Sequence, residues 1–276
     1  MELIVFDLDG TLLTADSVIS EYTKETLRLL SERGILYTVA TGRALHGARD
    51  ILAGHTFALP QAFKNGVMIW NPALEGYSHH THLTLDEIRH VLEAMLSQRV
   101  APFMFTLEPG DRHAIYHPPL QTRVEKDLAE SYRSRPDVAV QPASAIPADA
   151  EISNISALGT PGAIAAIEAM IEDEADLIAY AGPALEGDDL WWIDIHHMEA
   201  SKGNAVQLLR QELGVSRVVC FGDSDNDLSM FAMADEAYAP SNAKAEVLSA
   251  ATAVIGHHNE DGIARFLRER FDLADA

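Results

Sequence analysis

The sequence predicts an α/β protein in which a doubly wound, Rossmann-like parallel sheet forms the core and an α+β domain is inserted into it. Short apolar runs of strand length alternate with amphipathic helical segments in the first and last parts of the chain. Polar residues follow those runs directly, at the strand ends where open α/β sheets bind ligands. Between about residues 81 and 187 the pattern changes to strand-like runs joined by turns. We therefore expect a core of residues 1–80 and 188–276 and an insert of residues 81–187.

Composition limits the class of protein and its partners. With 276 residues, 47% of them hydrophobic, the chain is long enough for two domains. Its net charge of −22 argues against nucleic acid and anionic membranes as partners. The single cysteine, Cys220, excludes an intrachain disulfide. Neither a signal peptide nor a run of about 20 apolar residues is visible, so we expect a cytoplasmic protein. The sequence does not predict its oligomeric state.

The first part of the core begins with the stretch MELIVFDLDGTLL. Its apolar run Leu3–Phe6, which is typical of a strand buried on both faces, ends directly before Asp7. Gly34 ends the helix that follows, because glycine is a common helix cap. In order, the predicted elements are strand Leu3–Phe6, helix Glu21–Arg33, strand Ile35–Ala40, helix Ala44–Leu52 and a hairpin with a primed turn at Asn65-Gly66.

The inserted segment mixes helices with turn-connected strands. Its predicted helices cover residues 85–96, 121–134 and 162–172, and its strand-like runs are FMFTL, HAIYH, ISALG, LIAYA and LWWIDI. Pro109, Gly110 and Asp111 are the turn residues between the first two runs. This pattern favours a compact α+β domain of ordinary size.

The core pattern returns after the insert. Ser201 is suited to cap a helix that begins at Lys202, and Gly214 ends that helix. The apolar run Arg217–Phe221 predicts a buried strand that leads directly into the sequence GDSDND. A helix over Lys244–Ala250 and the terminal DGIARFLRERF continue the alternation of strands and helices.

Four groups of polar residues lie at these strand ends and helix starts. They are Asp7 with Asp9, then Thr41, then Lys202, and finally Asp223 with Asp225, Asn226 and Asp227. A doubly wound sheet would bring them to one crevice. Clustered aspartates are hard oxygen ligands that suit Mg²⁺. A hydroxyl and an ammonium at helix starts suit a phosphoryl group.

These motifs resemble those of the haloacid dehalogenase superfamily. DLDGT, TGR, a downstream Lys202 and GDSDND occur in the superfamily's order, and KNG, SKGNA, PSNAKAEV and EDGI are similar to its Cof-type, sugar-phosphatase-like branch. Members of that branch carry an α/β cap of type IIB between the second and third motifs, where the insert falls here. The resemblance covers the whole core, and it matches the cap in position and element order only.

The resemblance implies a role for each matched residue. Asp7 would be the nucleophile that forms an aspartyl phosphate, and Asp9 would be the general acid and base. Thr41 and Lys202 would bind the phosphoryl oxygens. The implied substrate-binding residues are Gly42, Arg43, Asn65 and Asn226. The implied Mg²⁺ site comprises Asp7, Asp9 through its main-chain carbonyl, Asp223 and, near the metal's waters, Asp227.

The resulting expectation is a Mg²⁺-dependent phosphatase that acts on a small phosphorylated metabolite, such as a sugar phosphate or a phosphorylated cofactor. A phosphomutase of the same superfamily and a non-catalytic phosphometabolite-binding protein remain alternatives. A response regulator lacks the second acid and the insert, and a P-type ATPase has threonine in place of Asp9 and needs membrane spans. Selectivity would depend on the cap, for example on the Pro183–Gly187 loop.

Other distinctive residues have structural interpretations. His79, His80 and His82 suggest a metal cluster, but no cysteine or spaced carboxylate completes it in the sequence, so a linker explains them more simply. We expect Cys220 to be an inert core residue. Of Trp191 and Trp192, one should pack into the core and the other lie at the surface.

Overall fold

The structure is a computed structural model that describes residues 1–55, 57–109, 112–135, 138–184, 187 and 189–273. Its contacts divide the chain into one unit of residues 1–79 and 200–276 and a second unit of residues 80–199. The predicted fold class is confirmed, because a parallel sheet forms the first unit and a mostly antiparallel sheet the second. No helix in the described part of the chain is long and apolar enough to cross a membrane.

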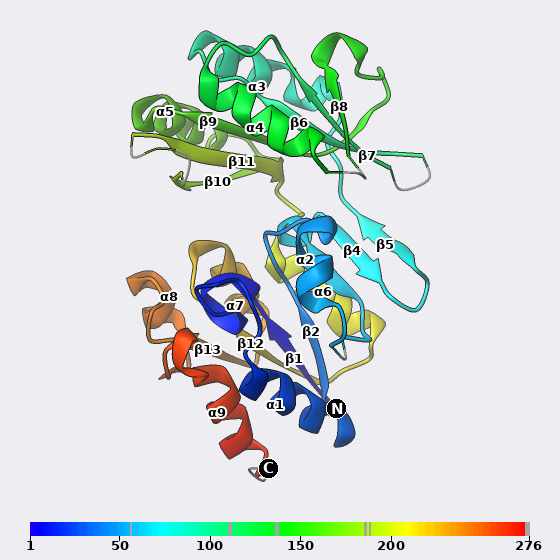
Figure 1. The fold of residues 1–276 in the computed structure, drawn as a ribbon, viewed down its shortest axis with the longest axis vertical. Helices are drawn as coiled ribbons and strands as arrows, with labels where there is room; N and C mark the ends of the chain where they lie inside the picture. The colour runs from blue at the N-terminus through cyan, green and yellow to red at the C-terminus, as the bar shows by residue number, and fades with distance from the viewer. Residues whose placement is uncertain (56, 110–111, 136–137, 185–186, 188, 274–276) are drawn as a thin grey trace. The chain divides into compact units, whose positions relative to one another are not determined.

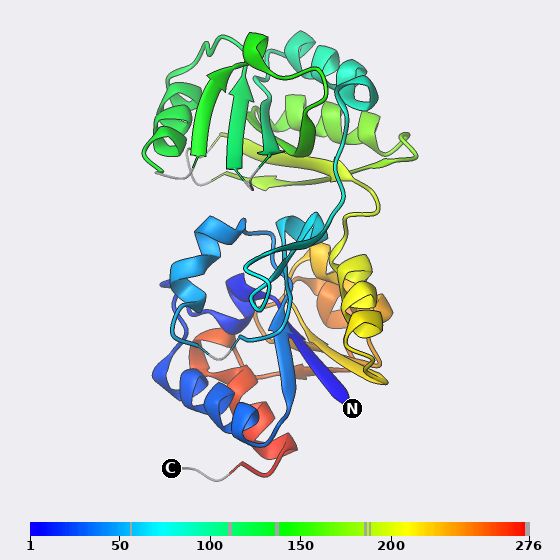
Figure 2. The same cartoon turned by 90° about the vertical axis from the view of Figure 1, so that its right-hand side faces the viewer.

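The first unit contains a five-stranded parallel sheet with the order β14-β13-β12-β1-β2 (Figures 1 and 2). Its strands are β1 (Glu2–Phe6), β2 (Leu36–Val39), β12 (Arg217–Phe221), β13 (Glu236–Pro240) and β14 (Ala253–Ile255). Its helices are α1 (Glu21–Glu32), α2 (Leu45–Leu52), α6 (Lys202–Glu212), α7 (Leu228–Met233), α8 (Ala245–Ala250) and α9 (Gly262–Arg270). Short helical turns occur at η1 (Leu8–Leu12), η4 (Asp225–Asp227) and η5 (His258–Glu260).

Alternate residues of β1 pack into two different hydrophobic clusters. Ile4 and Phe6 join the cluster that contains apolar residues of α1 and α9. Leu3 and Val5 join the cluster that contains those of α6, α7 and α8. Because side chains alternate between the faces of a strand, helices cover both faces of the sheet and β1 is buried throughout. Cys220 lies in this core as expected, and burial raises the pKa of its thiol.

A small sheet of three strands follows α2. Its strands are β3 (Gln61–Phe63), β4 (Met68–Asn71) and β5 (Gly76–His80). The hairpin predicted at Asn65-Gly66 is present, but the prediction of a primed turn there is wrong. Phe63 pairs with Met68 around a longer loop that contains η2 (Lys64–Gly66). The loop holds Asn65 at a positive φ of 56°, and its main-chain nitrogen donates to the carbonyl of Thr41 at 2.9 Å. The longer turn therefore anchors Asn65 beside Thr41.

The second unit contains a six-stranded sheet with the order β10-β11-β9-β6-β7-β8. Its strands are β6 (Phe103–Glu108), β7 (Arg112–His117), β8 (Val138–Pro142), β9 (Glu151–Gly159), β10 (Leu177–Pro183) and β11 (Trp191–His197). Its helices are α3 (Leu85–Ser97), α4 (Arg123–Arg133) and α5 (Pro161–Ile171), with a short turn η3 (Ala143–Ala145). Neighbouring strands are antiparallel, except that β7 and β8 are parallel.

The unit differs from the expected insert in two respects. The edge strand β8 was not predicted, because its stretch is rich in proline and alanine. The second border lies after Glu199 rather than at 187, since β11 pairs with β9 and β10. On β11, Trp191 packs against the core and Trp192 is 39% exposed, as expected. Gly110 and Asp111 of the predicted turn lie outside the described residues, as do Leu185 and Glu186 of the Pro183–Gly187 loop.

Candidate active site

Two adjacent strands bring the two aspartate motifs together. β1 and β12 pair in parallel up to Phe6 and Phe221, so the residues after them leave the same edge of the sheet. The main-chain nitrogen of Asp7 donates to the carbonyl of Phe221 at 2.9 Å, which continues this pairing by one residue. The chain then turns sharply through η1, where Gly10 has a positive φ of 72°. Asp7 and the segment that begins at Gly222 therefore lie side by side.

Lys202 lies between two carboxylates. It begins α6 after the cap Ser201, whose side chain accepts from the main chain of Asn204. Its ammonium donates to Oδ1 of Asp7 and to Oδ1 of Asp227, both at 2.6 Å. The Lys202 and Asp227 side chains are fully buried and that of Asp7 is 8% exposed. Charged groups this deep are stable only when paired and hydrogen-bonded, so Lys202 fixes both carboxylates in place.

Asp227 and Asp223 are held by a compact turn. Oδ2 of Asp227 accepts from the main-chain nitrogens of Asp223 and Ser224, both at 2.9 Å. Oδ1 of Asp223 accepts from the hydroxyl of Thr11 at 2.9 Å, and its Oδ2 accepts from that of Ser224 at 3.1 Å. Both Asp227 oxygens are thus satisfied by the protein. Asp223 is oriented by neutral hydroxyls, which leave its negative charge without a cation of its own.

The electrostatics of the cluster indicate an excess of negative charge. Burial raises the pKa of Asp7 well above its usual value; Lys202 opposes this effect, and the charges of Asp227 and Asp223 add to it. Burial and the charge of Asp227 also raise the pKa of Asp223. For Lys202 burial lowers the pKa, but Asp227 and Asp7 outweigh it and raise the pKa overall. Lys202 is therefore an ammonium, and one positive charge faces three carboxyl groups.

This arrangement fits a divalent cation. Asp7, Asp223 and Asp227 each offer a carboxylate oxygen, and these atoms all lie within 4.8 Å of one another. Within the described part of the chain, no hydrogen bond engages Oδ2 of Asp7. Asp7 and Asp223 therefore have free ligand capacity, whereas Asp227 already uses both oxygens. A hard cation with few protein carboxylates and several waters, such as Mg²⁺, suits this donor set.

A second polar group adjoins the aspartates at the end of β2. Thr41 is almost fully buried, and its hydroxyl accepts from the main-chain nitrogen of Arg43 at 3.1 Å. The side chain of Asn226 donates to that of Asn65 at 2.9 Å, and its buried Oδ1 has no hydrogen-bond partner among the described residues. A Cβ atom on Gly42 would approach Oδ1 of Asn65 to 3.2 Å, so glycine keeps this space open. The group can hydrogen-bond a small polar ligand.

Asp9 does not join the buried cluster. Its carboxylate is 54% exposed and receives two hydrogen bonds from Arg43, with Nε–Oδ2 at 2.7 Å and Nη2–Oδ1 at 2.5 Å. Arg43 also donates to the carbonyl of Gly47 at 3.2 Å and to the hydroxyl of Ser17 at 3.1 Å. The contact with Asp9, opposed in part by burial, raises the pKa of Arg43. The structure therefore shows Asp9 as the partner of Arg43.

The structure brings the residues implied by the resemblance into one region of the first unit. Sequence reasoning gave no role to Thr11, Ser17 or Asn242, although Thr11 lies in DLDGT and Asn242 in PSNAKAEV. Thr11 orients Asp223, and Asn242 donates to the carbonyl of Gly10 at 2.8 Å. The motifs could have identified these two residues as members of the site. Their partners could be named only from the folded structure.

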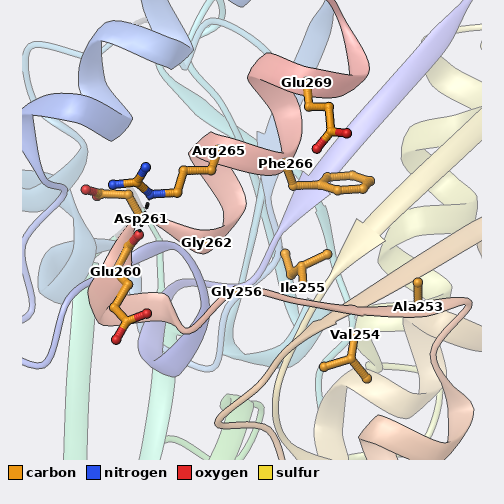
Figure 3. A pocket seen from close by; sticks show the side chains of 10 residues that line it. All are labelled: Ala253, Val254, Ile255, Gly256, Glu260, Asp261, Gly262, Arg265, Phe266 and Glu269. Carbon is orange, nitrogen blue, oxygen red and sulfur yellow. Dashed lines mark hydrogen bonds between the residues drawn. The ribbon is translucent and has the colours of Figure 1, made fainter.

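A separate hollow of about 690 Å³ lies beside β14 and α9 (Figure 3). Its charged lining residues are Glu260, Asp261, Glu269 and Arg265, and Nε of Arg265 donates to the carbonyl of Glu260 at 3.0 Å. The hollow contains none of the aspartates, lysine or threonine described above. Because acidic groups outnumber the single arginine, it does not suit a phosphate group.

The chain is similar in sequence to known hydrolases. The sequence profile of the haloacid dehalogenase-like hydrolases matches residues 4–267. A 5-amino-6-(5-phospho-D-ribitylamino)uracil phosphatase of Bacillus subtilis, YitU, is 26% identical, with 98% of each chain covered. The B. subtilis phosphatase YwpJ is 28% identical, with 97% of this chain and 99% of that protein covered.

Solved structures share the fold. A haloacid dehalogenase-like hydrolase from B. subtilis has a TM-score of 0.77 at 22% identity, over 97% of this chain and 99% of its own. A subclass IIB sugar phosphatase of the same superfamily has a TM-score of 0.73 at 18% identity, over 99% of this chain and all of its own. At these identities the similarity establishes the architecture only.

Proposed function

Because the chain belongs to the haloacid dehalogenase-like hydrolase family and is a phosphatase, we propose that it hydrolyses a small phosphorylated metabolite in a Mg²⁺-dependent reaction through a phosphorylated Asp7. The observation that carries the proposal is the position of Lys202, which pairs with Asp7 and Asp227. Beside them lies Asp223, whose carboxylate is bonded only to neutral hydroxyls among the described residues. A purely structural ion pair would not need a third carboxylate at this position.

Asp7 has the properties of a positioned nucleophile. Its main chain is fixed by the hydrogen bond to Phe221, and its Oδ1 is held by Lys202. One carboxylate oxygen of Asp7 would attack phosphorus, which would form an acyl phosphate and release the alcohol, and the other oxygen would remain available to the metal ion. Lys202 balances the negative charge of Asp7 and so reduces its repulsion of an anionic substrate.

Asp7 and Asp223 would hold the Mg²⁺ ion, with the main-chain carbonyl of Asp9 as a further ligand. Asp227 would support the site indirectly, because its oxygens already bind Lys202 and the main chain of Asp223 and Ser224. When bound, the ion would supply charge neutralisation for the transferring phosphoryl group.

The phosphoryl group would be bound by residues at the end of β2. The hydroxyl of Thr41 and the amide of Asn65 are donors for its oxygens, and Gly42 allows the main chain to come close. Asn226 orients Asn65 through their mutual hydrogen bond. Fixed donors of this kind are effective because they need no reorganisation during the reaction.

Asp9 would donate a proton to the leaving alcohol and later accept one from the water that releases phosphate. In the structure both carboxylate oxygens of Asp9 accept hydrogen bonds from Arg43. The acid role therefore requires the pair to open, so that Asp9 can face the leaving group. Because Asp9 is exposed, breaking the pair requires little free energy.

The substrate class rests on the relatives and on the second unit. YitU is named for a phosphorylated ribitylamino-uracil, and a structural neighbour is a sugar phosphatase. By analogy, residues 80–199 would act as a cap that selects the leaving group. Small phosphorylated metabolites are the substrates that such a capped site admits.

The test is phosphate release from a panel of phosphorylated metabolites and from p-nitrophenyl phosphate, with Mg²⁺ or EDTA. Asp7→Asn should lose about 10⁴-fold or more in kcat, and Asp9→Asn about 10²- to 10⁴-fold. The exposed Asp86→Asn on α3 serves as the control and should retain full activity. Phosphate release by Asp7→Asn at the native rate would contradict the assignment of Asp7 as the nucleophile.

The Asp9→Asn variant also tests the intermediate. p-Nitrophenolate leaves with little help from an acid, so the first step should be spared and the second slowed. We expect a burst of one p-nitrophenolate per chain and a phosphate label on Asp7. Conversion of a sugar phosphate to its isomer, without release of phosphate, would favour the phosphomutase alternative.

A further inference from the structure

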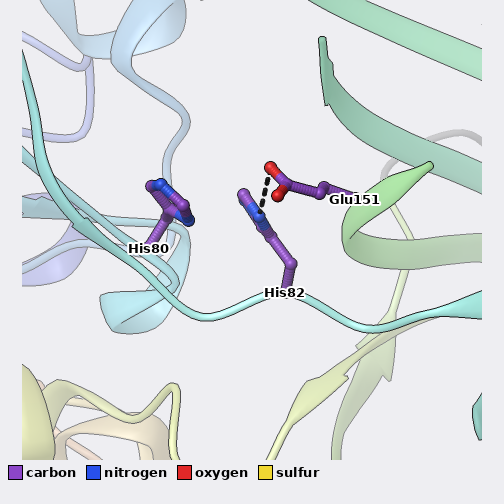
Figure 4. A group of neighbouring side chains, drawn as sticks. All are labelled: His80, His82 and Glu151. Atoms are coloured by element: carbon purple, nitrogen blue, oxygen red, sulfur yellow. Dashed lines mark ion pairs between the residues drawn. The ribbon is translucent and has the colours of Figure 1, made fainter. Parts of the chain in front are cut away.

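Two histidines and a glutamate meet at the start of the second unit. His80 ends β5, His82 follows two residues later, and Glu151 begins β9 (Figure 4). The three side chains offer ligand atoms that all lie within 4.8 Å of one another. The sequence argument against a metal site was that no carboxylate completes the histidine set. The fold supplies that carboxylate from a distant part of the chain.

We propose that His80, His82 and Glu151 bind a divalent transition metal ion of the zinc class. Two imidazoles and one carboxylate form a frequent ligand set for zinc, which leaves the fourth tetrahedral position for water. The exposure of Glu151, at 57%, gives such an ion access from solvent. The site is independent of the phosphatase reaction proposed above.

The contact between His82 and Glu151 has the spacing of two zinc ligands. Nδ1 of His82 lies 3.2 Å from Oε2 of Glu151. Two ligand atoms at about 2.0–2.1 Å from a tetrahedral ion are about 3.3 Å apart. His80 stacks on His82, with ring centroids 4.5 Å apart. Because His80 is exposed, it can turn its ring toward the ion at little cost.

The backbone fixes the positions of His82 and Glu151. Leu83 and Ile152 form an antiparallel bridge with hydrogen bonds of 2.7 and 2.9 Å, and both of their side chains are fully buried. Side chains alternate along extended segments, so His82 and Glu151 leave this bridge on the opposite face. His80, two residues before His82, lies on the same side of its segment. The ligand set is therefore a consequence of strand pairing.

The contact with Glu151 leaves the imidazole of His82 incompletely satisfied. Nδ1 of His82 faces Glu151, whereas its buried Nε2 has no hydrogen-bond partner among the described residues. Because either imidazole nitrogen can bind a metal, His82 has ligand capacity beyond its contact with Glu151.

A second histidine–glutamate contact supplies a matched comparison. Nε2 of His90 lies 3.0 Å from Oε1 of Glu174, and both side chains are partly exposed. No third ligand joins this pair in the described ranges. If a histidine–glutamate contact alone were sufficient, His90 would bind zinc as well as His82 does.

The test measures zinc retained by the full-length protein after dialysis with excess Mg²⁺, which occupies the aspartate site. The native protein and His90→Ala should each retain one zinc equivalent. His80→Ala, His82→Ala and Glu151→Gln should each lower the zinc affinity by about tenfold or more. Substitution with Co²⁺ should give the intense visible absorption of tetrahedral coordination in the native protein and in His90→Ala, but not in the three ligand variants.

If the three ligand variants retained as much zinc as the native protein, the proposal would be overturned, because the ion would then lie elsewhere. Failure of the native protein to retain zinc would also overturn it. His80→Ala and Glu151→Gln alter exposed side chains, so they keep the test valid if His82→Ala does not fold. Zinc should also raise the Tm of the native protein, but not that of Glu151→Gln.

Discussion

The candidate active site contains two ion-paired groups that differ in their surroundings, one around Lys202 and one formed by Asp9 and Arg43. Lys202 is fully buried between Asp7 and Asp227, whereas Asp9 is 54% exposed and pairs with Arg43. The nitrogen–oxygen distances are similar, at 2.6 Å for both Lys202 contacts and 2.7 Å for the Arg43 Nε contact. Burial makes the first pair costly to break, and solvent makes the second easy to exchange. We infer that the first positions the nucleophile and that the second can move during the reaction.

The largest expected effect is that of Lys202→Met. Removing the ammonium leaves Asp7 and Asp227 buried without a cation, so the free energy of unfolding should fall by about 3–5 kcal/mol. Activity should also be lost. Urea denaturation monitored by circular dichroism measures the change.

Lys24→Met is the matched control for Lys202→Met. Lys24 also contacts a carboxylate at 2.6 Å, that of Glu21, but its side chain is 37% exposed. Its loss should change the free energy of unfolding by less than about 1 kcal/mol. Similar losses in the two variants would show that burial does not distinguish the pairs.

The second prediction concerns Mg²⁺ and pH. Burial is the largest cause of the raised pKa of Asp7 and Asp223, so the metal-free folded state binds protons more tightly than the unfolded chain does. Its stability should therefore fall as pH rises from about 3.8 through the raised pKa values. Mg²⁺ competes with these protons. Its stabilisation, about 2.7 kcal/mol at a hundredfold excess over Kd, should be largest near neutral pH and smaller at acid pH.

Calorimetric Tm values with and without Mg²⁺ at several pH values provide this measurement. Asp223→Asn should abolish most of the Mg²⁺ effect, because it removes one of the two carboxylates with free ligand capacity. An Mg²⁺ effect that grows as pH falls would contradict the assignment of the ion to these carboxylates.

Gly10→Ala tests how rigidly the buried cluster is held. Gly10 has a φ of +72°, and an added Cβ would lie 2.5 Å from Oδ2 of Asp223. We expect a loss of about 2 kcal/mol in stability and a weaker Mg²⁺ affinity, because Asp223 must shift.

Gly34→Ala separates backbone strain from the contact with Asp223. Its φ is +70°, but apart from its chain neighbours no atom of the described residues lies within 4 Å of the added Cβ. It should lose about 1 kcal/mol of stability and keep its Mg²⁺ affinity. Isothermal titration with Mg²⁺ distinguishes the two variants, and equal affinities would show that the position of Asp223 tolerates change.

The meeting of Asp7 and Asp223 was predictable from sequence because both residues closely follow apolar strands. Asp7 comes after β1 and Asp223 comes two residues after β12, and parallel strands place such residues at one edge. The fold class followed from the same alternation. The exposed pair of Asp9 and Arg43 could not be predicted, because it depends on the side-chain directions of two loops. Strand spacing contains no information about such directions.

The pairing between distant strands also could not be predicted from the sequence. Glu151 gave no signal as a partner of His80 and His82, because the bridge between Leu83 and Ile152 brings it there. Similarly, LWWIDI was expected as a strand of the insert although the border was set at 187, and the pairing of β11 with β9 and β10 shows that the second unit continues to Glu199. Antiparallel sheets with long connections are specified by their packing, and local patterns do not reveal the order of their strands.

The smallest expected effect on stability is that of Arg43→Gln, which tests the mobile part of the site. The Asp9–Arg43 pair is partly exposed, so its loss should change the free energy of unfolding by less than about 1 kcal/mol. The variant should nevertheless alter catalysis, because the pair of hydrogen bonds from Arg43 no longer has to open before Asp9 can face the leaving group. We expect kcat/KM for a sugar phosphate to rise by up to about fivefold, which is the equivalent of about 1 kcal/mol. With p-nitrophenyl phosphate, whose leaving group needs little protonation, the rise should be smaller. Identical kcat/KM values in native protein and Arg43→Gln would mean that Arg43 does not restrain Asp9, and the proposed opening of the pair would then have no role in the reaction.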